Sequence, residues 1–140
     1  MKSKKPNGAV LFENDRIIVI ATGLARGSKN AKTGAMIQTW ILYRGANPVQ
    51  AIKTGADMHI CGDCPLRGDH GKERACYVRV GNAPLAVWRA YFRGNYPKLE
   101  LSQLADTFRG RFVRFGSYGE PTLIPLPIIR EIASVARGWM

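Results

Sequence analysis

The chain has 140 residues, a length that fits one domain and leaves little room for a second. Twenty-one lysines and arginines against ten aspartates and glutamates give a formal net charge of +11, which favours association with polyanions such as nucleic acids. An odd number of cysteines, three, argues against a disulfide framework, and no apolar run has the length of a signal peptide or membrane span. We therefore expect a cytoplasmic protein with no membrane partner.

The N-terminal third is predicted to be rich in β-structure. Residues 1–8 have the composition of a flexible basic tail that ends in a Pro-Asn-Gly turn signal. Residues 9–13 and 16–24 are short apolar and β-branched runs, typical of a hairpin whose second strand is buried on both faces. Residues 25–35 carry three positive charges and no large apolar side chain, which predicts an exposed loop. Residues 36–43 return to the composition of a strand.

The middle of the chain is predicted to hold another strand and then a helix. Residues 49–54 form a further β-prone run, which would lead into a cysteine-containing loop, and residues 77–80 form another after that loop. Asn82 is a candidate N-cap and Pro84 suits a first helical turn, so we expect a helix to follow. The remaining predicted elements are a short helix capped by Ser102 that ends at residue 108, a strand over residues 111–115, a turn-rich loop over residues 116–121 and a last helix opened by Pro127.

This order of elements predicts an α/β or α+β fold. We expect a single domain over residues 9–140, in which a β-rich N-terminal third precedes a strand, the cysteine loop, two helices, a strand and a helix. The cysteine loop and the turn-rich loop at 116–121 would both leave the carboxyl ends of strands. They are therefore expected to share one edge of the sheet.

The segment from His59 to residue 80 contains every cysteine and both histidines of the chain. A tetrahedral zinc site needs four nitrogen or sulfur ligands, and Cys61, Cys64 and Cys76 with His70 supply them. His59 is the alternative fourth ligand. A [4Fe–4S] cluster held by three thiolates is the competing occupant, and small thiols packed in a core without metal are the third interpretation.

Several basic residues in and near this segment are candidates for phosphate contacts, although solvated loop charge is the alternative interpretation. The candidate nucleic-acid-binding residues are Lys53, Arg67, Arg74, Arg79 and Arg114. A second set of groups lies at predicted strand ends, where an enzyme would place them. The candidate catalytic groups are Lys53, Asp57, Arg114, Tyr118 and Glu120, and only their position suggests them.

Several runs of this chain resemble a group of small, functionally uncharacterised proteins of bacteriophages and mobile elements. The runs are residues 60–67 (ICGDCPLR), 75–80 (ACYVRV), 83–91 (APLAVWRAY), 93–97 (RGNYP) and 114–121 (RFGSYGEP). The resemblance spans roughly residues 50–137 and implies a metal-bound α/β domain of phage origin, without a reaction. Glu120 stands where the family favours aspartate.

Two function classes follow from these patterns. The first is a small basic metal-binding protein that binds nucleic acid or a nucleic-acid-processing complex of the host cell. The alternative is an iron–sulfur or open-metal-site enzyme of unknown reaction. The sequence has no phosphate-binding Walker loop and no dinucleotide-binding fingerprint, so it leaves open whether the protein is an enzyme.

Overall fold

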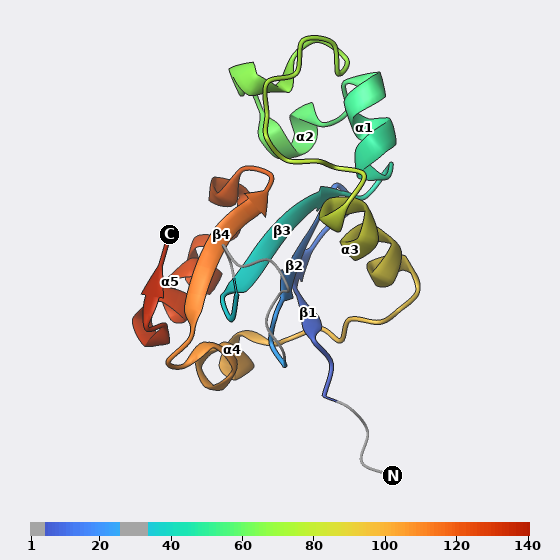
Figure 1. Ribbon diagram of the computed structural model, residues 1–140. Helices are drawn as coiled ribbons and strands as arrows, with labels where there is room; N and C mark the ends of the chain where they lie inside the picture. Colours follow the sequence, from blue (N-terminus) through green and yellow to red (C-terminus); the bar gives the residue numbers. More distant parts are fainter. Residues whose placement is uncertain (1–4, 26–33) are drawn as a thin grey trace.

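A computed structural model describes residues 5–25 and 34–140 of the chain. Within those residues, five strands form one sheet in the order β1-β2-β3-β4-β5 (Figure 1). The strands are β1 (Gly8–Glu13), β2 (Ile17–Thr22), β3 (Ile37–Tyr43), β4 (Phe112–Tyr118) and β5 (Gly138–Trp139). The first three pair antiparallel, whereas β4 is parallel to β3 and β5 is parallel to β4.

The helices lie at the ends and on the faces of this sheet. They are α1 (Pro48–Thr54), α2 (Met58–Cys61), α3 (Ala83–Phe92), α4 (Leu101–Phe108) and α5 (Leu126–Val135), with single 3-10 turns at η1 (Pro65–Arg67) and η2 (Pro121–Leu123). In Figure 1, α1, α2 and the loop after them form a lobe beyond the carboxyl ends of β3 and β4. The predicted α/β domain with a β-rich N-terminal third is confirmed.

The core is centred on β2. Ile18, Val19 and Ile20 are all fully buried, so side chains on both faces of this strand are covered, as the sequence predicted. The helices α4 and α5 pack together and contribute Leu104, Phe108, Ile128 and Ile132 to the same core. None of the helices in the described part of the chain is both long and apolar enough to cross a bilayer.

The prediction of a strand over residues 49–54 is wrong, because this segment is the helix α1. The side chain of Asn47 caps the helix by accepting a hydrogen bond from the backbone N–H of Gln50 (3.0 Å), and Pro48 occupies the first turn. Gly55 ends the helix with a φ of 79°, a conformation that favours glycine. The local start and stop signals therefore outweigh the strand propensity of Val49 and Ile52, and the cysteine loop follows two helices.

Other predicted boundaries also need correction. Residues 77–80 form no regular strand, and β4 continues beyond residue 115 to Tyr118. Ser102 lies inside α4, which is capped instead by the reciprocal bonds of Glu100 and Gln103. Residues 1–4 of the predicted basic tail and 26–33 of the predicted exposed loop lie outside the described residues. The tail was predicted too long, because Asn7 accepts hydrogen bonds from the backbone of Leu24 and Ala25, and β1 begins at Gly8.

A bulge interrupts the pairing of β3 with β4. Gln38 lies opposite Arg114 but Trp40 lies opposite Tyr118, so β4 advances further than β3 over this step. The Thr39 hydroxyl fills the gap, since Thr39 Oγ1 accepts from the Gly116 N–H (2.8 Å) and donates to the Arg114 carbonyl (3.2 Å). The bulge carries Tyr118 to the end of the sheet beside the lobe.

The buried Thr39 hydroxyl is expected to be important for stability. Thr39→Val removes the hydroxyl but keeps the side-chain shape, so two polar groups of β4 lose their partner and the free energy of unfolding should fall by about 1–3 kcal/mol. Urea denaturation measures the loss. The control Thr107→Val removes a hydroxyl that bonds only to the Gln103 carbonyl on α4, and it should change stability by less than about 0.5 kcal/mol. Equal losses in both variants would contradict the role given to Thr39.

Candidate metal centre and basic groove

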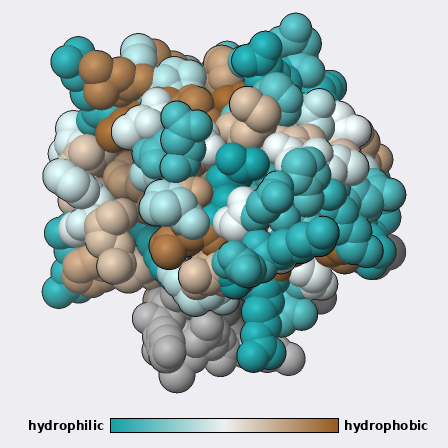
Figure 2. Space-filling view, turned by 90° about the horizontal axis from the view of Figure 1, so that it is seen from above, coloured by the Kyte–Doolittle hydropathy of each residue, from teal (hydrophilic) through white to brown (hydrophobic). Residues whose placement is uncertain are grey.

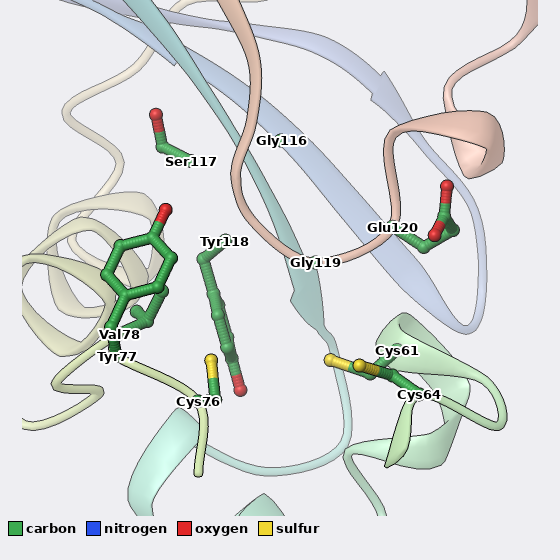
Figure 3. Close-up of a pocket in the computed structure, with 10 residues that line it drawn as sticks. All are labelled: Cys61, Cys64, Cys76, Tyr77, Val78, Gly116, Ser117, Tyr118, Gly119 and Glu120. Carbon is green, nitrogen blue, oxygen red and sulfur yellow. The ribbon is translucent and has the colours of Figure 1, made fainter. Parts of the chain in front are cut away.

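A hollow of about 170 Å³ opens between the cysteine loop and the end of β4 (Figure 3). We call it the cysteine hollow. Its lining residues are Cys61, Cys64, Cys76, Tyr77 and Val78 on the loop side and Gly116, Ser117, Tyr118, Gly119 and Glu120 on the sheet side. The backbone N–H of Glu120 donates to the Ile60 carbonyl (2.7 Å) and ties the two walls together. The prediction that these two loops share one edge is therefore confirmed.

The three cysteines reach the hollow from different local structures. Cys61 is the last residue of α2, Cys64 directly precedes η1, and Cys76 belongs to the irregular segment that follows. The Leu66 carbonyl accepts the backbone N–H groups of Ala75 (3.1 Å) and Cys76 (3.0 Å), which brings the third cysteine back beside η1. Figure 3 shows the Cys61 and Cys64 sulfurs together on one side and the Cys76 sulfur across from them. All three are free thiols.

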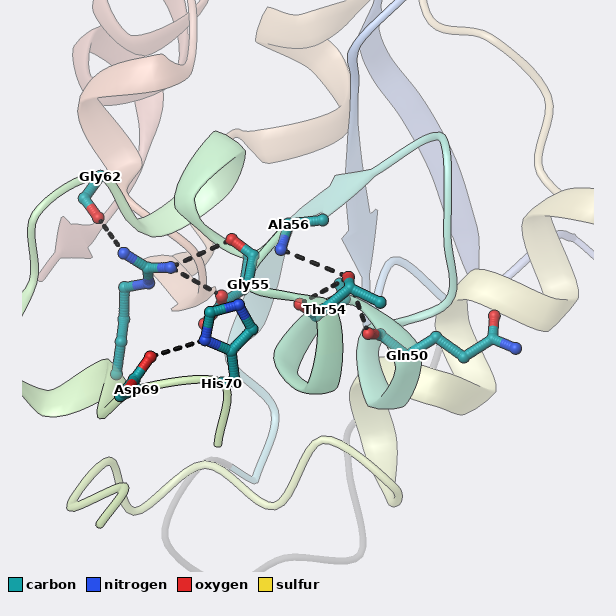
Figure 4. A network of polar contacts seen from close by, with 10 residues as sticks. Gln50, Thr54, Gly55, Ala56, Gly62, Asp69 and His70 are labelled. Carbon is teal, nitrogen blue, oxygen red and sulfur yellow. Dashed lines mark hydrogen bonds and ion pairs between the residues drawn. The ribbon is translucent and has the colours of Figure 1, made fainter. Parts of the chain in front are cut away.

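Neither histidine lines the cysteine hollow. The His70 Nδ1 lies 2.6 Å from Asp69 Oδ1, and its Nε2 faces Gly55 at the end of α1 (Figure 4). The His59 ring stacks on Tyr43 with the ring centroids 4.8 Å apart. Across residues 5–25 and 34–140, no three Cys, His, Asp or Glu side chains are placed to hold one metal ion. The predicted ligand sets with His70 or His59 therefore stay predictions.

The Tyr118 hydroxyl is a buried polar group without a partner. Tyr118 is only 2% exposed, and its hydroxyl makes no hydrogen bond within the described residues. Burial, and then the neighbouring Cys61, raise the pKa of Tyr118, so the phenol keeps its proton and remains a donor. Because buried polar groups are nearly always hydrogen-bonded, this hydroxyl is available to donate to a group bound in the hollow, a water molecule included.

The Cys61 thiol is poorly suited to act as a free nucleophile. Burial, and then the Asp57 carboxylate, raise the pKa of Cys61 to about 11, so the protein without a bound cation holds this sulfur as a neutral thiol at neutral pH. Reactive cysteines instead have a lowered pKa in a positively charged environment. A ligand role, in which a metal replaces the proton, fits this sulfur better than a redox pair.

A buried ion pair fixes the cysteine loop to the end of α1. Arg67 Nη2 lies 2.8 Å from Asp57 Oδ1, and the Asp57 side chain is only 3% exposed. Arg67 also donates to the carbonyls of Gly62 (2.9 Å) and Gly55 (3.2 Å), as Figure 4 shows. The guanidinium is therefore engaged inside the loop, and it is poorly placed to contact a phosphate.

A second hollow, an open groove of about 490 Å³, lies on the other side of the loop against α1. We call it the basic groove. Its lining residues are Val49, Ile52, Lys53, His70, Gly71, Lys72, Arg74, Val78, Arg79 and Val80, with no acidic side chain among them. Lys53, Lys72 and Arg79 are exposed, whereas Arg74 is half-buried and donates to the Val78 carbonyl (3.2 Å). Figure 2 views the lobe end of the molecule and shows hydrophilic residues over much of this face.

The basic groove brings together three of the five predicted phosphate-binding residues, which are Lys53, Arg74 and Arg79. Lys72 was not among the predicted residues, although its place two positions before Arg74 in the same basic loop was a usable signal. Arg114 lies elsewhere, where it contacts the Tyr77 hydroxyl with its guanidinium 5.9 Å from the centre of that ring.

The predicted catalytic groups are dispersed. Lys53 lines the basic groove, Asp57 is paired with Arg67, and the Glu120 carboxylate accepts from the Thr122 N–H (3.1 Å) at the start of η2. Tyr118 alone of the five presents an unpartnered polar atom in the cysteine hollow.

No protein-family model, curated protein or solved structure matches this chain. The chemistry of the cysteine hollow and of the basic groove is therefore the basis for assigning a function.

Proposed function

We propose that this chain is a small, basic, phage-type protein that binds nucleic acid, with its cysteine loop held by a metal. The basic groove is the observation that carries the proposal. Four cationic side chains, Lys53, Lys72, Arg74 and Arg79, line the groove together with valine and isoleucine, and no carboxylate is present among the lining residues. Such a groove neutralises successive phosphates and tolerates any sequence. Free thiols fit the reducing cytoplasm of a host cell.

The kinds of side chain that line the basic groove determine how it is expected to bind nucleic acid. The residues that line the groove include no phenylalanine, tyrosine or tryptophan that could stack on bases and no asparagine or glutamine that could read base edges, and the one aromatic ring, His70, is hydrogen-bonded to Asp69. Phosphate contacts from lysine and arginine position a strand but do not specify its sequence. We therefore expect salt-sensitive binding to single-stranded or double-stranded nucleic acid with little sequence preference.

The proposed metal supports the groove through a shared wall. Val78 lines both the cysteine hollow and the basic groove, and Cys76 and Arg79 flank it in the same irregular segment. This segment has no strand or helix to hold it. A metal bound by Cys76 therefore fixes the chain that presents Arg74 and Arg79.

The proposal predicts that charge at the groove dominates binding. A triple variant, Lys53→Gln, Lys72→Gln and Arg79→Gln, should reduce affinity for a labelled oligonucleotide at low salt. It should also lower the slope of log affinity against log salt by about 3, since each lost phosphate contact removes about one counterion. Fluorescence anisotropy over a salt series, with DNA and RNA strands, measures both quantities.

A matched control variant has the same net charge as the groove variant. The triple variant Lys98→Gln, Arg109→Gln and Arg130→Gln removes the same charge from exposed residues outside the groove, and its salt slope should stay near that of the wild type. Equal effects of the two triples would show diffuse attraction and contradict a groove-centred site. Undetectable binding of the wild type to any strand at low salt would overturn the proposal in favour of an acidic surface on a host protein complex.

An enzyme with an iron–sulfur cluster or open metal site is the second candidate function. The unpartnered Tyr118 hydroxyl in the cysteine hollow is the observation that favours it, because a buried phenol beside three thiols can donate a proton or a hydrogen bond there. The hollow is small, and the single carboxylate among its lining residues, Glu120, is engaged at η2. The described residues thus supply one candidate donor and no paired base, which makes binding the better-supported function.

A further inference from the structure

We infer that the cysteine hollow holds a [4Fe–4S] cluster bound by Cys61, Cys64 and Cys76, with one iron left free of protein ligands. This inference rests on the proposed metal-held loop and identifies the metal group. Three observations carry it: the three thiols that line one hollow, the unpartnered Tyr118 hydroxyl, and the placement of both histidines outside the hollow.

The three thiols line one hollow but are not placed around a single ion. All three line one hollow of about 170 Å³, yet the described residues include no set of three ligands placed for a single ion. A zinc ion draws its four ligands to one centre. In a cluster each thiolate binds a different iron, so the sulfurs lie farther apart around the group. Figure 3 shows the Cys76 sulfur across the hollow from the Cys61 and Cys64 sulfurs, so a group that all three sulfurs bind has to span the hollow.

The Tyr118 hydroxyl needs an acceptor inside the hollow. The side chain is buried at 2% exposure, and Figure 3 shows it between Cys76 and the Cys61–Cys64 pair. Its hydroxyl has no partner among the described residues. Cluster sulfides and cysteine thiolates both accept hydrogen bonds, and such bonds tune the reduction potential of a cluster. The phenol is therefore suited to donate to one of these sulfurs.

The two histidines that were predicted to complete a zinc site do not line the hollow. His70 lies against Asp69 at the end of α1, and His59 is stacked on Tyr43. Glu120 caps η2, and the Ser117 hydroxyl donates to Gln38 Oε1 (2.9 Å). Three thiolates without a fourth protein ligand suffice for a cluster, whose remaining iron binds solvent or a small molecule. Each thiol releases its proton as its sulfur binds iron.

Anaerobic reconstitution with ferric iron, dithiothreitol as the reductant, and sulfide tests the inference. The wild-type protein should bind four irons and four sulfides per chain, absorb broadly in the visible range, and give a paramagnetic resonance signal after reduction with dithionite. Cys61→Ser, Cys64→Ser and Cys76→Ser should each lose bound iron and this signal. Cys64 is exposed, so its serine variant should keep the far-ultraviolet circular dichroism of the folded protein.

The control variants address the fourth iron and the tyrosine. His59→Ala and His70→Ala should retain the full iron content, and a loss in either would overturn the inference that no histidine binds the cluster. Tyr118→Phe should retain the iron but move the reduction potential to more negative values, because a hydrogen bond to sulfur is lost. An unchanged potential would overturn the role of the hydroxyl. One tightly bound zinc per chain, with no reconstitution by iron and sulfide, would overturn the cluster, while the salt titrations test the basic groove separately.

Discussion

Replacing Gly119 with alanine is expected to lower the free energy of unfolding by about 3–5 kcal/mol. Gly119 has a φ of 86°, which strains any residue with a Cβ. A Cβ there would also lie 2.7 Å from the Ile41 Cβ and 2.9 Å from the Ile41 carbonyl oxygen, so the chain would have to move away from β3. Urea denaturation followed by circular dichroism measures the loss.

Substitutions at two other glycines distinguish the contribution of backbone strain from that of steric overlap. Gly94 and Gly110 have φ values of 75° and 70°, but a Cβ on either would meet nothing within 4 Å. Gly94→Ala and Gly110→Ala should therefore lower the free energy of unfolding by only about 1 kcal/mol each, because only the left-handed backbone conformation opposes the added Cβ. If Gly119→Ala costs no more than these two, the close approach of the turn to β3 is not important for stability.

Replacing Arg67 with methionine should lower the free energy of unfolding by about 3 kcal/mol. Methionine keeps much of the side-chain volume but leaves the Asp57 carboxylate buried at 3% exposure without its cation. The Gly55 and Gly62 carbonyls lose donors in the same step. Thermal or urea denaturation of the metal-free protein measures this loss independently of any bound metal.

A double-mutant cycle isolates the ion pair from the packing of Arg67. Once Asp57→Asn has removed the buried charge, Arg67→Met should cost at least about 1 kcal/mol less than it does alone. Arg109→Met is the control, because its partner Asp106 is 3.7 Å away and both side chains are mostly exposed. That variant should change stability by less than about 0.5 kcal/mol. Additive losses at positions 57 and 67 would mean that the pair does not hold the loop.

A strand could be predicted where apolar, β-branched residues dominated the composition of the run. The apolar, β-branched run of β2 fits a strand buried on both faces, and it is buried on both faces. Residues 49–54 have a similar composition but form α1, because Asn47 caps the helix and Gly55 ends it. Asn47-Pro48 both ends the extended run of β3 and starts a helix, so this pair is compatible with either structure for the residues that follow. The two-residue strand β5 has no pattern of its own and depends on its pairing with β4.

The candidate site was predictable in its location but not in its contacts. The spacing of Cys61, Cys64 and Cys76 identified the loop, and the topology placed that loop beside residues 116–121. The bond from Arg67 to the Gly55 carbonyl could not be predicted, because it depends on the end of α1, a segment that was expected to be a strand. The unpartnered hydroxyl of Tyr118 is a property of three-dimensional burial, for which a single sequence carries no signal.

The bulge between β3 and β4 also sets how far the sheet reaches toward the lobe. Between Gln38 and Trp40 the β3 chain advances two residues while β4 advances four, from Arg114 to Tyr118. Gly116, with a φ of 72°, lies in this stretch, so side chains do not alternate regularly between the two faces there. A loss or gain of residues in this stretch would therefore change where β4 ends, and with it the position of the Tyr118 ring in the cysteine hollow.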